Sequence, residues 1–574
     1  MSSKPHHRTF VFPILIVFLT ACGPAWGSDI ANPGTTGVVA SAQLQGETAT
    51  FTPYQPESST VIPTPTATAS FTPTSTTTTT PLPATLWISP AVPATLRQAA
   101  LSSGIPIASD QAAATVHLDA TTGAGSATWI YALVSPFPTL IEGVSLDDIR
   151  NAWTGGTGGP FGGKPFRMDA TTLAAFTAIW GPPASRSVYV IPPERLIDLT
   201  WTERPIWSII PFEALEPRWK VLTVDGQAPI RKDFDPAKYP LKVSFTVQPA
   251  AFPLPSTNRD PARLTVLAMT GVTALVRGTA DRMERKGILY PDQQIRDVLR
   301  AADLTHISNE VPFYSGCPTP NPYTGSMRFC SDPRYIALLE DVGTKIVELT
   351  GNHMLDYGPS ALLTTLDMYT QRGWTYYGGG KDLADAQKYA LVEDHGNKLA
   401  FLGCNPNGPS SDWATATSPG SAPCDYDQMR ATIGLLRSAG YLPIVTLQYM
   451  EYYMPNPTSY ERKDFRSLAE AGAIIVSGSQ AHVPQIMEFD SGSFIHYGLG
   501  NLFFDQMSYL LPSGQRIPDT RYEFVDRHII YDGKYLGVEL LTYMLEDYAQ
   551  PRPMTPTERN DFLTGIFTAA GWAP

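Results

Sequence analysis

Apolar runs of strand length alternate with amphipathic segments of helix length from residue 86 almost to the end of the chain. The apolar runs occupy residues 127–134, 187–191, 219–224, 263–269, 345–349, 399–402, 444–447, 473–476 and 537–544. Helical patterns occupy residues 94–103, 145–152, 293–302, 333–342 and 557–570. This alternation predicts an α/β fold, because strands and helices that alternate along a chain pack against each other as layers.

Composition divides this pattern into segments. Residues 249–261 contain four prolines, which predicts a join between a smaller α/β domain at 86–255 and a larger one at 262–574. Residues 22–85 are rich in Thr, Pro and Ser and have no periodic apolar positions, so we expect an extended linker there. A chain of 574 residues has room for two to four domains.

The first 21 residues have the features of a signal peptide. A basic start at 4–8 precedes an apolar run at 10–19 that is too short to span a bilayer. Residues 19–22, Leu-Thr-Ala-Cys, resemble the lipobox of bacterial lipoproteins, and this resemblance implies cleavage before Cys22 and lipidation of its thiol and amine. We therefore expect an extracytoplasmic protein, lipid-anchored to the bacterial cell membrane. The alternative is an ordinary secretory signal that happens to contain a cysteine.

The balance of acidic and basic residues disfavours two classes of binding partner. There are 41 Lys and Arg against 53 Asp and Glu, a net charge of −12. This argues against a nucleic-acid binder, which needs a basic face for phosphate contacts. It also argues against direct binding of an acidic polymer, unless the site is locally basic or bridged by a metal.

The remaining four cysteines predict two disulfides. Their number is even in a protein expected to be exported, and pairing Cys317 with Cys330 and Cys404 with Cys424 closes two short loops. Four cysteines allow three pairings, so the choice rests on this closeness in sequence. A zinc site is the competing interpretation, and the lack of any Cys-x-x-Cys spacing argues against it.

Polar residues come directly after several of the predicted strands. They are Asn309 and Glu310, then Asn352, His353 and Asp356, then Gln448 and Glu451, and finally His482 and Asn501. Because α/β proteins place their sites at the carboxyl ends of strands, we expect these side chains to gather at one sheet edge. Carboxylates, amides and imidazoles together can hold a divalent metal or position a water.

Several of these segments match one family in order. Residues 351–358 read Gly-Asn-His-Met-Leu-Asp-Tyr-Gly, glycines occupy 378–380, and two further motifs lie at 472–485 and 497–501. Together they resemble the CapA family of poly-gamma-glutamate capsule synthesis proteins over about residues 263–505. The resemblance implies a fold like that of calcineurin-type metallophosphatases and a hydrolase or transferase activity. It also implies a divalent metal cofactor, manganese or zinc, and cell-surface polymer or capsule components as partners.

The resemblance also implies roles for the polar residues. They are catalysis by His353, Asp356 and Glu310, metal binding by Glu310, Asn352 and His482, and substrate binding by Asn309, Gln448, Glu451 and Asn501. Each residue taken singly also has a structural interpretation, such as a hydrogen-bonded core histidine for His482 or a turn cap for Asn501.

Three departures from the family pattern support a different hypothesis. Val272 stands where the family has an Asp, Gln448 where it has a His, and Ser479 where it has the first His of a Gly-His motif. A two-metal site needs a bridging carboxylate and several imidazoles. The alternative is therefore a non-catalytic scaffold that binds a polymer or a partner protein.

The first domain supports a third hypothesis. Residues 86–250 resemble the type 2 periplasmic solute-binding fold, although the segment is shorter than a complete two-lobed binding protein. The resemblance implies a ligand-capturing lipoprotein in which this domain does the binding. A spacer domain without a ligand is the alternative.

Overall fold

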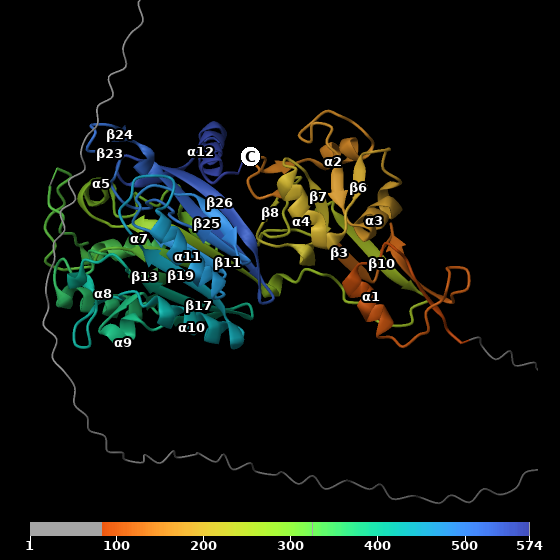
Figure 1. The fold of residues 1–574 in the computed structure, drawn as a ribbon, viewed down its shortest axis with the longest axis horizontal. Coiled ribbons are helices and arrows are strands. Elements are labelled where there is room, and N and C mark those ends of the chain that lie inside the picture. Colours follow the sequence, from red (N-terminus) through yellow and green to blue (C-terminus); the bar gives the residue numbers. More distant parts are fainter. Residues whose placement is uncertain (1–82, 324, 573–574) are drawn as a thin grey trace, which may run out of the picture. The chain divides into compact units, whose positions relative to one another are not determined.

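The computed structural model describes residues 83–323 and 325–572, and these described residues form one compact unit. The predicted signal peptide, Cys22 and most of the predicted linker lie outside the described residues. Within the described part, two α/β lobes follow one another along the chain (Figure 1): a first lobe from β1 to β10 and a second lobe from β11 to α12. No helix in this part is long and apolar enough to cross a membrane.

The first lobe is built on an eight-stranded mixed sheet. Its strands lie in the order β1 (Leu86–Ile88), β2 (Val116–Thr121), β10 (Lys242–Gln248), β3 (Ala127–Pro136), β7 (Ser208–Pro211), β5 (Phe166–Met168) and β6 (Val188–Val190), and β8 (Trp219–Val221) pairs with β3. The short strands β4 (Gly143–Val144) and β9 (Thr223–Val224) form a separate pair. The helices are α1 (Ala94–Leu101), α2 (Leu146–Trp153), α3 (Ala170–Trp180) and α4 (Pro193–Thr202).

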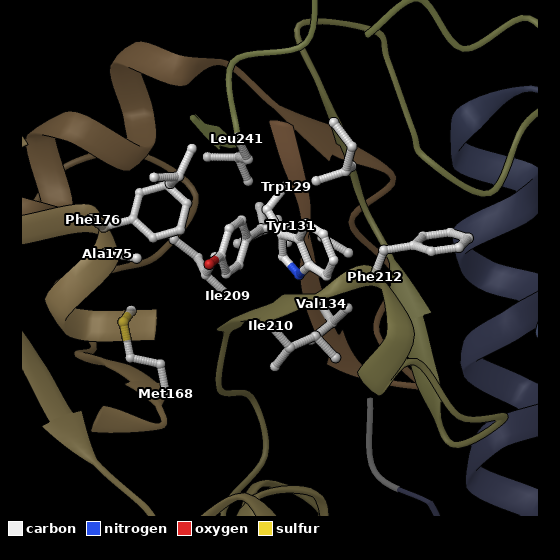
Figure 2. Close-up of a cluster of buried hydrophobic side chains, with 14 of the residues drawn as sticks. Trp129, Tyr131, Val134, Met168, Ala175, Phe176, Ile209, Ile210, Phe212 and Leu241 are labelled. Atoms are coloured by element: carbon white, nitrogen blue, oxygen red, sulfur yellow. The ribbon is translucent and has the colours of Figure 1, made fainter. Parts of the chain in front are cut away.

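Strand β3 is the centre of the first lobe's core, because nearly all of its residues are buried. Figure 2 shows Trp129 and Tyr131 of β3 among side chains from β7 and α3, and the rings of Tyr131 and Phe176 meet edge to face at 5.0 Å. Aromatic side chains of this size contribute much of the apolar area that a core buries. The lobe is α/β, as predicted. The resemblance to a solute-binding fold remains a prediction.

The second lobe contains two sheets packed face to face. Sheet I has the order β14 (Thr375–Tyr377), β13 (Thr344–Glu348), β12 (Leu304–Asn309), β11 (Leu264–Thr273), β25 (Tyr522–Tyr531), β26 (Lys534–Glu546) and β27 (Gln550–Pro553). Sheet II has the order β16 (Ala390–Asp394), β17 (Asn397–Cys404), β19 (Leu442–Gln448), β20 (Ile475–Ser479), β22 (Ser493–His496) and β21 (Met487–Asp490). Two further pairs are β15 (Gly379–Gly380) with β18 (Gly420–Ser421), and β23 (Tyr509–Leu510) with β24 (Arg516–Ile517).

Helices cover the outer faces of both sheets. They are α5 (Arg277–Lys286), α6 (Arg296–Arg300), α7 (Ile336–Asp341), α8 (Pro359–Gln371), α9 (Leu383–Ala386), α10 (Tyr426–Ser438) and α11 (Ser459–Glu470). The last helix, α12 (Pro556–Ala569), instead packs its buried face against the apolar cluster between the sheets. One apolar cluster joins the inner faces of the sheets through residues such as Met269 and Phe401. A second packs α5 to α8 on sheet I, and a third packs α10 and α11 on sheet II (Figure 1). The result is an α/β sandwich.

Several predicted elements differ in extent from those in the structure, and two of these differences lie in the second lobe before β12. The helix expected at 293–302 is reduced to the five residues of α6, because the Asp292 carbonyl accepts hydrogen bonds from the Ile295 and Arg296 amides and keeps the preceding residues in a turn. The strand expected at 263–269 continues to Thr273, since the Val272 amide donates to the Gly500 carbonyl at 3.1 Å. That extension carries β11 to the edge where the polar residues lie.

Candidate functional site

Strand ends from both sheets meet at one edge of the sandwich. In sheet I, β11, β12 and β13 run parallel with Thr273 opposite Asn309 and Ser308 opposite Glu348. In sheet II, β19 and β20 are parallel with Gln448 opposite Ser479. Their carboxyl ends lead directly into residues 310, 350–353, 448 and 479–482, which is the arrangement expected of a site in an α/β protein.

Gly351 brings two of these segments into contact. A Cβ atom at this position would lie 2.8 Å from the Glu310 carbonyl oxygen and 2.9 Å from its Cα, closer than real Cβ atoms come. Only glycine therefore allows the backbone after β13 to pass against Glu310. This close approach sets Asn352 beside the Glu310 carboxylate.

Gln448 is the centre of the polar cluster. Its Nε2 donates to Asn352 Oδ1 at 2.9 Å and to Glu310 Oε1 at 3.2 Å, and it also contacts Gln480 Oε1. Glu310, Gln448 and Gln480 are buried, so little water competes for these contacts. Three oxygens converge on the Gln448 Nε2, but an amide nitrogen carries only two hydrogens, so it cannot donate a full hydrogen bond to all three. The sequence predicted Glu310, Asn352 and Gln448 together but missed Gln480, which follows β20 with a left-handed φ of 79°.

His353 is oriented by Asp356. Its Nδ1 lies 2.8 Å from Asp356 Oδ2, and the same carboxylate oxygen accepts the Phe329 amide at 2.6 Å. Burial acts to lower the pKa of His353, but the hydrogen bond to Asp356 and the charge of Glu310 outweigh it, so the pKa is raised above its ordinary value. The imidazole is thus held with Nδ1 engaged, and Nε2 is the ring nitrogen left for chemistry.

Asp412 is a third member of this group that the sequence did not reveal. It is buried, and its carboxylate accepts a hydrogen bond from the Leu355 amide, next to Asp356. Burial raises the pKa of Asp412 to about 6, and the charge of Asp356 adds to that effect while His353 opposes it. No spacing motif links position 412 to residues 352–356, so a sequence pattern had no means of finding it.

The two predicted disulfides form and frame the site. Cys317 is bonded to Cys330 and Cys404 to Cys424, so both predicted pairs are confirmed. The first loop carries Phe329, whose ring lies 4.6 Å from that of His353. The second loop carries Asp412. Each disulfide therefore tethers a loop that contributes a side chain to the His353 group.

His482 is oriented from behind by Asn501. The Asn501 Nδ2 donates to the carbonyls of Thr520 at 3.1 Å and His482 at 3.4 Å, so its Oδ1 is the atom that accepts from His482 Nδ1 at 2.8 Å. This arrangement fixes the proton on Nδ1 and leaves Nε2 with a lone pair. Asn501 is fully buried, and its contacts fit a positioning role.

The remaining predicted residues lie at the margins of the cluster. Asn309 is buried and donates to Val311 O at 2.7 Å and to the Tyr369 hydroxyl at 2.8 Å, which places it behind the site. Glu451 is exposed and accepts a hydrogen bond from the Tyr453 hydroxyl at 2.5 Å. The structure therefore brings Glu310, Asn352 and Gln448 into contact but leaves Asn309 and Glu451 outside that contact.

An aromatic wall connects the two histidines. The Arg277 guanidinium lies 4.9 Å from the Phe329 ring and 5.0 Å from the Phe504 ring, and the Phe504 ring lies 5.2 Å from that of His482. Arg277 also pairs with Asp505 at 2.5 Å. No sequence pattern pointed to Arg277, because its position depends on the contact between the end of β11 and residues 500–505.

A buried acid lies beneath the cluster, between the sheets. Glu348 accepts from the hydroxyls of Thr350 and Ser479, the latter at 3.5 Å. Burial raises the pKa of Glu348, although the surrounding hydroxyls oppose the shift. Ser479, one of the three departures from the family pattern, is thus hydrogen-bonded to a carboxyl group rather than facing a ligand.

The residues at the cluster do not fit a two-metal centre. Val272 offers no ligand atom, and the Gln448 amide nitrogen fills the point on which three oxygens converge. Among the described residues, the three His, Cys, Asp or Glu side chains that come close enough to share an ion are Asp303, Asp394 and His395. Asp303 precedes β12, at the opposite end of that strand from Glu310.

Residues 266–506 match the family described as "Bacterial capsule synthesis protein PGA_cap". The chain is 25% identical over 226 residues to the PGA biosynthesis protein CapA of Bacillus subtilis (strain 168), covering 39% of this chain and 59% of that protein. It is 23% identical over 257 residues to the capsule biosynthesis protein CapA of Bacillus anthracis, covering 44% and 62%. The chain thus spans about six-tenths of the length of these relatives.

Two solved structures to which this chain is similar have lower sequence identity to it than the two CapA relatives have. A hypothetical protein from Thermus thermophilus aligns with a TM-score of 0.31 at 14% identity, over 49% of this chain and 100% of that one. A 5'-nucleotidase precursor from the same organism aligns with a TM-score of 0.28 at 14% identity, over 54% and 59%. Similarity at this level assigns no function. The family match over residues 266–506 and the two CapA relatives support the predicted resemblance to CapA proteins in the second lobe.

Proposed function

We propose that this protein acts at the cell surface in the synthesis, attachment or processing of a capsule-type polymer, with poly-gamma-glutamate as one candidate. One observation carries the proposal: the segment that matches the PGA_cap family, 266–506, contains every residue of the converging cluster. Anchoring through a lipid on Cys22 would keep the domain outside the membrane and is part of the same proposal.

The geometry supports a hydrolysis or transfer reaction. Glu310 would take the proton of an attacking water or acceptor hydroxyl as its oxygen bonds to the target atom. His353, whose pKa is raised by its hydrogen bond to Asp356, would give its Nε2 proton to the leaving group as the old bond breaks. The proton gained by Glu310 and the proton lost by His353 balance, so the site returns to its starting state by exchange with water.

A metal is a separate part of the proposal. The oxygens of Glu310, Asn352 and Gln480 would hold one divalent ion, manganese or zinc, if the Gln448 amide turned away from them. Such an ion would act as a Lewis acid toward the bond that is broken. Two ions would need ligands that Val272 and Gln448 do not supply.

Activity is tested by incubating the full chain with poly-gamma-glutamate and with capsule polysaccharide and following polymer length on gels. We expect shortening or transfer that His353→Gln abolishes. His395→Gln is the matched control, because His395 is exposed and lies outside the cluster. Unchanged activity in His353→Gln would contradict the assigned role.

Metal binding is tested by exposing the full chain to Mn²⁺ or Zn²⁺, desalting it and measuring the retained metal by mass spectrometry. One ion per chain, lost in Glu310→Gln, would support the single-ion site. The same loss in His395→Gln would instead point to the Asp303 group.

The second candidate is a non-catalytic scaffold that holds a polymer or partner. The observation that favours it is the position of the Gln448 amide, which occupies the centre of the oxygen cluster. In that case no polymer would change length, no ion would be retained, and binding to the polymer would survive His353→Gln.

A further inference from the structure

A groove adjoins the candidate site on the side of His482. It has a volume of about 420 Å³ and lies between α12, the segment directly after His482, and residues of β25 and β26. Tyr453 lines it, and the Tyr453 ring is stacked 6.3 Å from that of His482. Tyr453 therefore lies between His482 and this groove, which we call the α12 groove.

The charged residues that line the α12 groove are all acidic. Among the residues that line it, Asp519, Glu558 and Asp561 are charged, and none is Lys, Arg or His. Glu558 is neutralised by Arg552, which donates to both of its carboxylate oxygens at 2.7 and 2.8 Å. Asp519 and Asp561 make no side-chain hydrogen bond or ion pair with another residue in the described part of the chain.

The environment of Asp519 favours a cationic neighbour. The residue is exposed at the rim of the groove, so a ligand can reach it. The protein around its carboxylate still displaces part of the water, and this partial burial raises the pKa of Asp519 because no cation compensates for it. A positive group entering the groove would supply that missing partner. A polyanion would instead add like charge beside two carboxylates without cations of their own, which is unfavourable.

Aromatic faces lie beside these carboxylates. The rings of Tyr522 and Phe562 are 5.2 Å apart and tilted by 54°, and both residues are half-buried with part of their surface in the groove. Aromatic faces attract ammonium groups through their quadrupole. They also offer a flat apolar surface on which the ring of a sugar can stack.

We propose that the α12 groove binds an amine-bearing sugar polymer, with its protonated amino groups beside Asp519 and Asp561 and its sugar rings on Tyr522 and Phe562. The inference rests on the proposed function, since it names the class of polymer that the second lobe handles. It selects against poly-gamma-glutamate as the occupant of this groove.

The test is a binding titration of the full chain by calorimetry with two matched ligands at mildly acidic pH. One is a glucosamine hexamer, whose amines are protonated, and the other is its fully N-acetylated counterpart. We expect the charged hexamer to bind about tenfold more tightly, since two carboxylate contacts and cation–π contacts are lost on acetylation.

Variants of the protein separate charge from fold. The double variant Asp519→Asn with Asp561→Asn should weaken binding of the charged hexamer about tenfold and leave the acetylated one unchanged. The matched control, Asp233→Asn with Asp367→Asn, removes the same charge at exposed positions outside the groove and should bind like the wild type. Equal melting temperatures confirm that both double variants are folded.

Several outcomes would overturn the proposal. They are equal binding of the two hexamers, no loss in the groove variant, or tighter binding of poly-gamma-glutamate. If oligolysine binds as tightly as the glucosamine hexamer, the ligand class assigned to the groove would be a basic peptide and not an amine-bearing sugar polymer. The protein could bind the glucosamine hexamer and yet neither shorten nor transfer any polymer. That result would support the proposed ligand of the groove and overturn only the proposed catalytic activity.

Discussion

His306 makes the stability of the second lobe depend on pH in a way that can be isolated. The residue lies on β12 between the two sheets, 1% exposed, with Nε2 2.7 Å from the Tyr377 hydroxyl and its ring stacked 6.3 Å from Phe401. Burial lowers the pKa of His306 to about 3, from an ordinary value of 6.5. The folded protein therefore holds this imidazole neutral at pH values where the unfolded chain protonates it.

The sign and size of the effect follow from that difference. Because the folded pKa is depressed, the contribution is complete above pH 6.5 and is lost as the pH falls from 6.5 toward 3. At about pH 5, the unfolded chain gains about 2 kcal/mol from protonating His306 that the folded chain cannot gain. Buried acids such as Glu348, whose pKa is raised, act in the opposite direction, so the wild-type profile alone does not isolate His306.

The measurement is urea unfolding of the wild type and of His306→Gln at about pH 7.5 and about pH 5, where one unit of pKa difference corresponds to about 1.4 kcal/mol. Gln keeps a donor for Tyr377 but does not titrate. We expect the wild type to lose about 2 kcal/mol more than the variant between the two pH values. His395→Gln, a change at an exposed histidine, should follow the wild type. Parallel pH profiles for wild type and His306→Gln would refute the reasoning.

Three further changes test the frame around the site. Replacing Cys404 and Cys424 together by Ser should cost about 3 kcal/mol of unfolding free energy, measured by urea unfolding, because a loop of 20 residues is no longer closed; a loss under about 1 kcal/mol would argue against that account. Gly351→Ala should reduce metal retention or polymer turnover at least about tenfold, since its Cβ would displace Glu310; wild-type values would contradict the close approach. Thr458→Ala removes the capping box of α11 and should cost about 1 kcal/mol in thermal unfolding, with no effect on activity.

Strand-end residues were predictable because periodicity alone fixes where a buried strand stops. Glu310, Asn352 and Gln448 follow three such strands, and the structure brings all three into hydrogen-bonding contact. Asp412 and Arg277 were not predictable, since their positions depend on a disulfide-closed loop and on the contact between β11 and residues 500–505.

The sequence pattern also could not predict which of the polar residues are buried behind the site. Asn309 is the last residue of β12 and Asn501 lies beyond the end of β22, yet both are buried and hydrogen-bonded behind the site. The sequence shows that a polar residue ends a strand but not whether its side chain points to solvent or into the sandwich. That choice is made by partners distant in sequence, such as Tyr369 for Asn309 and Thr520 for Asn501.

The two disulfide-closed loops have a consequence for the order in which the protein matures. Phe329 and Asp412 reach the His353 group from loops that close only when their cysteines are oxidised. While thiols are kept reduced, as they are in the cytosol, neither loop is tethered by its disulfide, and Phe329 and Asp412 would be held less firmly beside His353. A newly made chain would thus carry a less firmly held site until it enters an oxidising compartment. Transport and assembly of the site would then be coupled without any separate regulator.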